Sequence, residues 1–381
     1  MNRILLFFCT LLFFSSCARQ GNSSNHISRK DSLSDCAKSV PLKYAKNFAF
    51  DETQDGYRLH LIHRDSSQSD TTTFFLIRGL LLDSANTPHT LSIPLRKIAS
   101  LSGTHLEFLQ LLESFSSLTF TCDSDFIYSP DARKLIRDGK IATLGNSMQI
   151  NCEKLLMNKP DLLLLSDERE RPSIDICPTL VCQEWKEEDV LARAEWIKFF
   201  ALLTDHYSLA EVLFDSIESN YLRLKDLAST AQECPTLFSA SCFGDTWYMT
   251  GGKGYMAQLY RDAHTNFLLS DTLVSTVVCD LEWMMNHTQE ADYWLNCQTF
   301  HAEELDSRLS SLPSVQRHKV YHFNKRAIDG QGIAISDFFE SAVAHPDILL
   351  KDVVFLLHPS LSEDSLLSQY STTYIDSVRF Q

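Results

Sequence analysis

The chain has 381 residues, enough for two domains that each bury a sizeable core. Its formal net charge is −15, and the acidic residues are spread along the chain rather than gathered in a tail. This charge argues against nucleic acid or an anionic membrane surface as a partner. The 12 glycines leave little material for glycine-rich phosphate loops.

The N-terminus predicts a targeting segment. A positive charge precedes an apolar run, Ile4 to Phe14, that is too short to span a bilayer. Two serines then lead to Cys17, a pattern that resembles the bacterial lipobox, in which the cysteine is lipidated. A plain secretory signal with cleavage elsewhere is the alternative. We predict a signal peptide at 1–16, lipidation at Cys17 and a polar tether over 17–35.

The cysteines of an exported chain can form disulfides. Nine remain after Cys9 and Cys17, so at least one is unpaired. No spacing matches a zinc or redox motif, and most of the thiols are expected to be free and buried. Cys177 and Cys182 are close enough in sequence to form a bridge.

A β layer is predicted over 36–92. Tyr57, Leu59 and Leu61 alternate with more polar residues, as expected for a strand with one buried face. The segment 71–77, TTTFFLI, is the predicted partner strand, so this layer is expected to be a hairpin.

From 93 to 187 short apolar runs alternate with helical patterns. This rhythm predicts parallel strands joined by helices, hence an α/β lobe. The strands are expected at 97–101, 118–122, 141–144 and 161–165, with helices after Ser102, at 129–138 and at 151–157.

A long helix is predicted over 208–228, within a helical linker at 188–232 that also carries a helix at 192–203. Its apolar residues recur at steps of three and four, and Ser208 with Glu211 forms a capping-box pattern. At 1.5 Å per residue it is about 30 Å long, enough to join two lobes. An ordinary helix inside one larger domain is the alternative.

A second α/β lobe is predicted over 233–381. The expected strands are 236–241, 246–249, 293–295 and 319–323, and the expected helices are 255–264, 279–286, 301–309 and 337–357, the last broken at Pro346. The fold class is therefore α/β, with two lobes of parallel strands joined by a long helix and a small N-terminal β layer.

Several short motifs, in order, resemble the periplasmic-binding proteins of iron, haem and corrinoid ABC importers, and most of all the lipoprotein members from Bacteroides-like bacteria. They are IASLSGTHLEF (98–108), ARAEWIKFFALL (192–203), DTWYMTGGKGYMAQL (245–259), ADYWLN (291–296) and HPDILLKDVVFLLHP (345–359). The resemblance implies a class III fold that holds a metal chelate between two lobes and delivers it to a membrane permease.

This sequence departs from that family twice. The stretch between Leu165 and Leu180 is shorter than usual, which implies a more open cleft edge in the first lobe. Ser-Asp-Phe-Phe-Glu at 336–340 stands where relatives tend to show Asn-Asp-Tyr-Trp-Glu, and this change removes a tyrosine hydroxyl. Both changes concern the ligand more than the fold.

Ligands of α/β sheets bind outside the carboxyl ends of the strands, at loops and helix N-termini. Trp247 and Tyr248 offer aromatic faces to a bulky chelate, although both are equally expected to pack the lobe edge. Lys253 and Arg326 can bind anionic oxygens, although Lys253 also fits a solvated turn. The candidate ligand-binding residues are Thr104, His105, Tyr128, Arg169, Trp247, Tyr248, Lys253, Tyr255, Asn324 and Arg326.

His105 is a possible ligand of haem iron or cobalt, but a structural donor at a helix start is the preferred interpretation. A bare-metal site needs three or four converging ligands, and no second His, Asp or Glu stands at a matching position nearby. TGGKG at 250–254 lacks the P-loop Ser or Thr, and no nucleophile elbow is present. We predict no enzyme activity, no metal site and no cofactor apart from the bound chelate.

The predicted function is capture of a ferric siderophore, haem or corrinoid and its delivery to an ABC importer permease. The chain is expected to be a lipid-anchored monomer. The periplasmic side is favoured over the cell surface, because the segment after Cys17 lacks acidic residues. Two alternatives remain open, a scavenging or structural lipoprotein with a degenerate cleft and a redox enzyme on the same scaffold.

Overall fold

The computed structural model describes residues 37–64, 69–79, 89–270, 273–274, 276–330 and 333–380. All of them belong to one compact unit that begins at Ala37. The predicted signal peptide at 1–16, the lipidation site Cys17 and the tether over 17–35 lie outside the described residues. Among those residues, no helix combines the length and the apolar character that crossing a bilayer requires.

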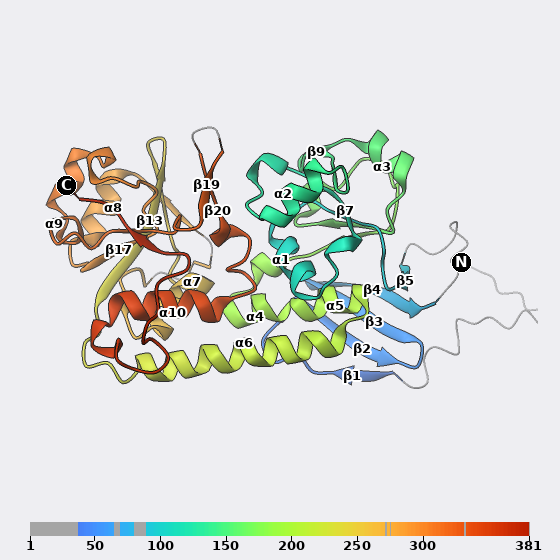
Figure 1. Ribbon diagram of the computed structural model, residues 1–381, viewed down its shortest axis with the longest axis horizontal. Coiled ribbons are helices and arrows are strands. Elements are labelled where there is room, and N and C mark those ends of the chain that lie inside the picture. The colour runs from blue at the N-terminus through green and yellow to red at the C-terminus, as the bar shows by residue number, and fades with distance from the viewer. Residues whose placement is uncertain are drawn as a thin grey trace, which may run out of the picture. The chain divides into compact units, whose positions relative to one another are not determined.

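A mostly antiparallel sheet opens the described chain (Figure 1). The predicted pairing of 57–61 with 71–77 is confirmed, and Leu59 lies opposite Phe74. The layer is larger than one hairpin, because two strands extend it on one side and a parallel strand on the other. Its strands, in sheet order, are β1 Lys38–Val40, β2 Phe48–Thr53, β3 Gly56–Arg64, β4 Ser69–Arg78 and β5 Thr90–Ile93.

Gly56 is required at the turn between β2 and β3. Its φ is +152°, and a Cβ at this position would lie 2.0 Å from the carbonyl oxygen of Leu76. The turn therefore brings the backbone of β3 against β4 more closely than any side chain allows.

The first lobe contains a fully parallel sheet, as the sequence predicts. Its order is β12-β11-β6-β7-β8, and every pair within it is parallel. All four residues of Leu162–Leu165 are buried, because helices cover the sheet. The strands are β6 Ile98–Ser100, β7 Leu118–Thr121, β8 Ala142–Thr143, β11 Leu162–Leu165 and β12 Thr179–Val181, and the helices are α1 Thr104–Leu111, α2 Pro130–Arg137 and α3 Cys152–Asn158.

Helix α6, Tyr207–Ala228, confirms the predicted long helix and contributes to the cores of both lobes (Figure 1). Ala210, Phe214 and Ile217 pack into the core of the first lobe and the β layer. Tyr221 and Leu224 pack into the core of the second lobe. The apolar stripe of α6 thus packs into both cores, so this one helix fixes the distance between them.

Two details of the linker differ from the prediction. The prediction of a capping box at Ser208 and Glu211 is wrong, because the helix starts at Tyr207 and no side chain caps its N-terminus. The predicted helix at 192–203 is two helices, α4 Val190–Glu195 and α5 Ile197–Thr204. Trp196 lies at the junction with a ψ of −12°, and its indole N–H donates to Glu187.

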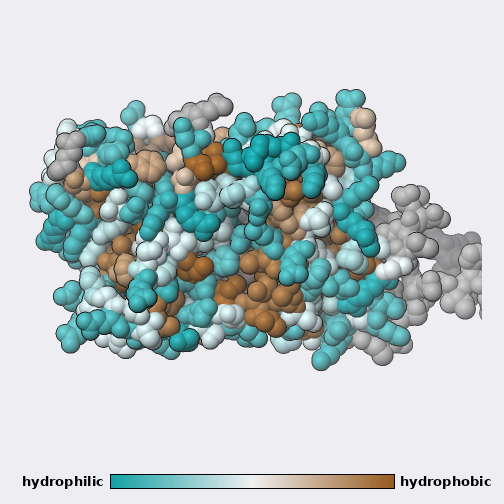
Figure 2. Space-filling view, in the orientation of Figure 1, coloured by the Kyte–Doolittle hydropathy of each residue, from teal (hydrophilic) through white to brown (hydrophobic). Residues whose placement is uncertain are grey.

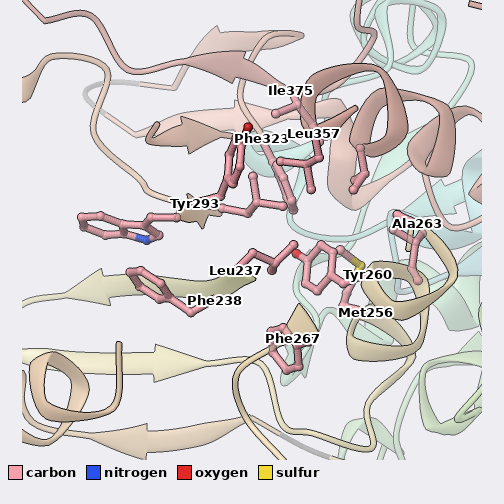
Figure 3. Close-up of a cluster of buried hydrophobic side chains, with 14 of the residues drawn as sticks. Leu237, Phe238, Met256, Tyr260, Ala263, Phe267, Tyr293, Phe323, Leu357 and Ile375 are labelled. Atoms are coloured by element: carbon pink, nitrogen blue, oxygen red, sulfur yellow. The ribbon is translucent and has the colours of Figure 1, made fainter. Parts of the chain in front are cut away.

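The second lobe has a mixed sheet rather than a purely parallel one. β15 and β17 run parallel to β13, whereas β14 pairs antiparallel with β13 on one side and with β16 on the other. Figure 3 shows its core, where Leu237 of β13 lies beside Tyr260 of α7, while the ring of Phe238 points away from Tyr260 and stacks on Trp294. The main elements are β13 Thr236–Phe243, β14 Thr246–Met249, α7 Tyr255–Asp262, β15 Asn266–Phe267, β16 Val277–Cys279, α8 Leu281–Thr288, β17 Tyr293–Leu295 and α10 Pro346–Leu357.

Several predicted boundaries in this lobe are corrected. The helix expected at 279–286 starts at Leu281, because Val277–Cys279 pairs with β14. The helix expected at 301–309 is two short 3₁₀ turns. Pro346 begins α10 instead of breaking a helix, as its missing N–H is tolerated in a first turn. A hairpin of β19 Ala327–Asp329 and β20 Ala334–Ser336 was not predicted.

The eight cysteines within the described residues are free thiols, so the predicted bridge between Cys177 and Cys182 is wrong. The extended strand β12 separates the two residues. Cys182 is buried, and its thiol donates instead to Glu184 at 3.3 Å.

Candidate ligand-binding cleft

The parallel sheet of the first lobe places the carboxyl ends of five strands along one edge, where ligands of such sheets bind. Four of the loops that follow these strands carry predicted site residues or their neighbours. Thr104 follows β6, Tyr128 follows β7, Arg169 follows β11 and Glu184 follows β12. The candidate site is therefore a line of loops rather than one pocket.

Large apolar side chains are exposed on these loops. Phe126 and Trp185 of the first lobe are 62% and 43% exposed, and Phe339 of the second lobe is 61% exposed. Exposed aromatic side chains of this kind mark ligand grooves and interaction surfaces. Others in comparable positions are Met148 after β8, Phe243 at the end of β13 and Ile333 in the β19–β20 hairpin.

The two lobes contact each other directly through Glu340. Its carboxylate accepts the backbone N–H of Tyr128 and, at 2.9 Å, that of Ser129. Both groups lie at the start of α2, where N–H groups lack partners inside the helix. A second contact joins His345 Nε2 to Glu107 Oε1 at 2.9 Å.

Two predicted site residues, Tyr128 and Arg326, meet at this contact from opposite lobes. The guanidinium carbon of Arg326 lies 5.7 Å from the centroid of the Tyr128 ring. Beside them is a cavity of about 190 Å³. Its wall includes Glu107, Asp131, Asp337, Glu340 and His345.

Carboxylates dominate the charge of this contact. Arg326 is already paired with Asp337, at 3.1 Å. Burial raises the pKa of Glu340 to about 7, and the nearby charges of Asp337 and Glu107 act in the same direction. Figure 2 shows hydrophilic side chains over α2 beside this contact and apolar ones near the β19–β20 hairpin. Because Arg326 is already paired and carboxylates surround it, an anionic ligand would gain little binding free energy at the contact between the lobes.

Tyr255 lines a different cavity, of about 210 Å³, at the start of α7. The Arg193 guanidinium carbon lies 4.1 Å from the centroid of its ring. Phe338 and Phe339 form another wall, and the Phe338 ring also packs against Phe323 with centroids 4.7 Å apart. The Phe-Phe pair that departs from the family pattern thus fills space with its own rings.

Trp247 lines a third cavity, of about 740 Å³, within the second lobe. The indole is almost fully buried and packs against Trp294, with ring centroids 5.7 Å apart. Tyr248 is exposed, because neighbouring residues of a strand point to opposite faces. The carboxylates of this cavity are Asp245, Asp280, Glu282, Glu304 and Asp306.

Residues 98–327 match the sequence profile of a family described as periplasmic binding protein, which is more than half of the chain. The chain belongs to the periplasmic binding protein family. The family name indicates a place in the periplasm or cell envelope, and a role in binding rather than catalysis.

The chain is also similar to individual proteins. Uncharacterized lipoprotein MJ0878 of Methanocaldococcus jannaschii is 21% identical over 287 residues, which cover 71% of this chain and 66% of that protein. The chain therefore spans just under two thirds of that relative. Among solved structures, a possible iron-binding, periplasmic solute-binding protein of Staphylococcus epidermidis is 15% identical with a TM-score of 0.53 over 70% of this chain and 99% of its own.

The periplasmic haem-binding protein HutB of Vibrio cholerae is 15% identical, with a TM-score of 0.53 over 69% of this chain and 99% of that chain. At such identities the likeness shows the fold alone. The two-lobed α/β fold with a long connecting helix is that of class III periplasmic binding proteins, as the sequence predicts.

The other predicted site residues of this periplasmic binding protein do not line the cavity at the contact between the lobes. Arg169 is exposed and paired with Asp167 at 2.8 Å, and Lys253 is exposed. Asn324 is half-buried, and its backbone N–H donates to His322. Thr104 and His105 lie beneath the edge, where the Thr104 hydroxyl donates to Glu184 at 2.7 Å.

Sequence reasoning missed the residues that join the lobes and the partners of His105. Glu340 and His345 stand in helical or turn patterns with no mark of a distant partner. Cys182 and Glu184 lie 77 and 79 positions after His105, yet the structure brings all three together. The sequence offered one signal for these partners: in VCQE (181–184), Cys182 and Glu184 directly follow a short apolar strand.

Proposed function

We propose that this periplasmic binding protein is a lipoprotein, anchored through Cys17 on the periplasmic side, that captures a metal chelate and delivers it to an ABC importer permease. The observation that carries the proposal is the set of exposed aromatic side chains formed by Phe126 and Trp185 on the carboxyl-edge loops of the first lobe and Phe339 of the second lobe. Two similar structures are named for iron or haem binding, which supports the ligand class.

The chelate is expected to bind on the exposed rim rather than in the cavities beside Glu340 and Tyr255. Ligand pockets usually measure about 300–1,000 Å³. The cavities beside Glu340 and Tyr255, of about 190 and 210 Å³, are smaller than this range. The cavity beside Trp247, of about 740 Å³, falls within it, but it lies inside the second lobe and is lined by carboxylates. Deeper entry requires the contact between Glu340 and the start of α2 to open.

Charge favours a neutral chelate. Arg326 is already paired, and carboxylates line the cavity beside it. Haem and ferric catecholates carry negative charge, whereas cyanocobalamin is neutral. We therefore propose that the chain binds a corrinoid more tightly than haem or a ferric catecholate.

The test is a titration of the chain from Ala18 onward with haemin, cyanocobalamin and a ferric catecholate, followed by absorbance and tryptophan fluorescence. We expect saturable one-to-one binding, tightest for cyanocobalamin. Phe339→Ala should weaken the affinity about tenfold. An aromatic contact that the ligand buries contributes about 1.4 kcal/mol, which corresponds to a factor of ten. Val212→Ala, an exposed apolar residue on the outside of α6, is the matched control and should leave affinity unchanged.

A second candidate is a scavenging or structural lipoprotein whose cleft no longer binds a chelate. The observation in its favour is that Glu340 joins the two lobes and that the rings of Phe323 and Phe338 pack against each other beside the cavity at Tyr255. Absence of saturable binding to all three probes, in a protein that melts cooperatively, would favour this candidate and reject the importer proposal.

A further inference from the structure

Three potential metal ligands meet inside the first lobe, beneath the carboxyl edge of its sheet. His105, Cys182 and Glu184 each offer a ligand atom, and these atoms lie within 4.8 Å of one another. Glu184 Oε2 lies 3.3 Å from the Cys182 sulfur and 3.8 Å from His105 Nε2. All three side chains are almost fully buried.

His105 Nε2 has no hydrogen-bond partner although it is buried. The distance of 3.8 Å to Glu184 is too long for a hydrogen bond. A buried polar atom without a partner is unfavourable and calls for an explanation. Its direction, toward the thiol and the carboxylate, points to a ligand between the three groups.

The other nitrogen of His105 is held in a way that suits metal binding. Nδ1 lies 2.7 Å from the hydroxyl oxygen of Ser100, and that hydroxyl donates its single proton to the carbonyl of Ser102 at 3.3 Å. With the hydroxyl donating to Ser102, its oxygen is free to accept from Nδ1–H. Such a hydrogen bond fixes the ring and leaves Nε2 as the coordinating atom, as in most metal-binding histidines.

We propose that His105 Nε2, Cys182 Sγ and one oxygen of Glu184 bind a divalent transition-metal ion of the zinc class, resident in the protein. Nitrogen, sulfur and carboxylate oxygen are the ligands that Zn²⁺ takes in proteins. Tetrahedral bonds of the usual lengths place such ligand atoms about 3.4–3.6 Å apart. The distances of 3.3 and 3.8 Å to Glu184 bracket this range.

Charge and hydrogen bonding agree with this site. The thiol loses its proton on binding, so a thiolate and a carboxylate balance the double positive charge of the ion in a buried place. The Thr104 hydroxyl donates to the second oxygen of Glu184 at 2.7 Å, which leaves the other oxygen for the metal. The described part of the chain supplies three ligands, His105, Cys182 and Glu184. A water molecule would be the fourth ligand of a tetrahedral ion.

The ion would tie α1 to the edge strand of the sheet. His105 lies in the first turn of α1, whereas Cys182 and Glu184 follow β12. Trp185, the exposed aromatic residue at the carboxyl edge, is the next residue after Glu184. The buried ion is therefore a structural support for the rim and distinct from any chelate bound on it.

The experiment uses the full-length chain purified in detergent. Its metal content is measured by mass spectrometry, and after exchange into Co²⁺ its absorbance is recorded. We expect one zinc ion per chain and a thiolate-to-cobalt charge-transfer band in the near ultraviolet. Cys182→Ser should abolish the band and most of the bound metal, whereas Cys122→Ser, at another buried cysteine of the same lobe, should keep both.

A thermal melt of the unsubstituted chain with and without a chelator keeps the proposal testable if Cys182→Ser does not fold. A fall in melting temperature of several degrees on removal of the metal is expected. The proposal is overturned if the unsubstituted chain carries no stoichiometric metal, gives no cobalt band and melts at the same temperature with chelator. Such a result would leave His105, Cys182 and Glu184 as a metal-free cluster of buried polar side chains.

Discussion

Glu184 in the first lobe and Glu340 at the contact between the lobes are both buried, 1% and 5% exposed, yet their acidities differ greatly. Burial opposes ionisation in both, but the imidazole of His105 and the charge of Arg193 lower the pKa of Glu184 to about 2. Burial raises the pKa of Glu340 to about 7, since its charged neighbours are Asp337 and Glu107. The difference teaches that neighbouring charges, not depth, decide whether a buried carboxylate is permanent or switchable.

The largest effect is expected from Glu184→Ala. The change removes the acceptor of the Thr104 hydroxyl and the buried negative charge that faces His105 and Arg193, and removing one partner of a buried charge pair costs about 3–5 kcal/mol. Urea unfolding should show a lower midpoint with an unchanged slope. Glu188→Gln, an exposed neighbour, should stay within about 0.5 kcal/mol of the parent, and an equal loss in both variants would remove the distinction.

The free energy of unfolding is expected to depend on pH through Glu340, whose pKa is raised rather than lowered. Its pKa is higher in the folded state than the ordinary value of 4.5, so the folded protein holds a proton that the unfolded chain releases. The free energy of unfolding should therefore fall by up to about 3 kcal/mol as pH rises from about 4.5 to about 7. Urea unfolding at a series of pH values measures this slope.

Glu340→Gln, which carries no titrating proton, should flatten the slope over this window. Subtracting the profile of the variant from that of the parent isolates Glu340 from other groups. An unchanged profile in the variant would show that Glu340 does not act as a switchable contact between the lobes.

A smaller effect is expected at the second contact between the lobes. The His345–Glu107 pair is partly exposed, so its loss in His345→Gln should cost about 1 kcal/mol. A double-mutant cycle with Glu107→Gln measures the coupling free energy directly. A coupling near zero would leave Glu340 as the more important of the two contacts.

The smallest effect is expected where the charge is not buried. Lys253→Gln should leave the free energy of unfolding within about 0.5 kcal/mol of the parent, because Lys253 is exposed. If Lys253 meets anionic ligands, haemin affinity should fall about threefold to fivefold while cyanocobalamin affinity is unchanged. Equal losses for the two probes would indicate a role in shape rather than in charge.

Local sequence pattern predicted the elements whose side chains repeat. The stripe of α6 and the pairing of 57–61 with 71–77 follow from periods of 3.6 and 2 residues, which need no knowledge of distant partners. The buried run Leu162–Leu165 predicted a parallel strand for the same reason. Errors fell where a neighbour in space decided the outcome, as at Trp196, whose indole binds Glu187.

Sequence by itself determined the α/β class and the long helix, because the period of the hydrophobic residues can be read along the chain. Whether that helix joins two lobes or lies inside one larger domain stayed open at that stage. Only the tertiary structure decided the polar sites. The sheet order β12-β11-β6 brings Glu184 to His105, and the packing of the two lobes brings Glu340 to Tyr128 across 212 positions. Such pairs depend on which strands become neighbours and how lobes dock, and no local period in a single sequence records either.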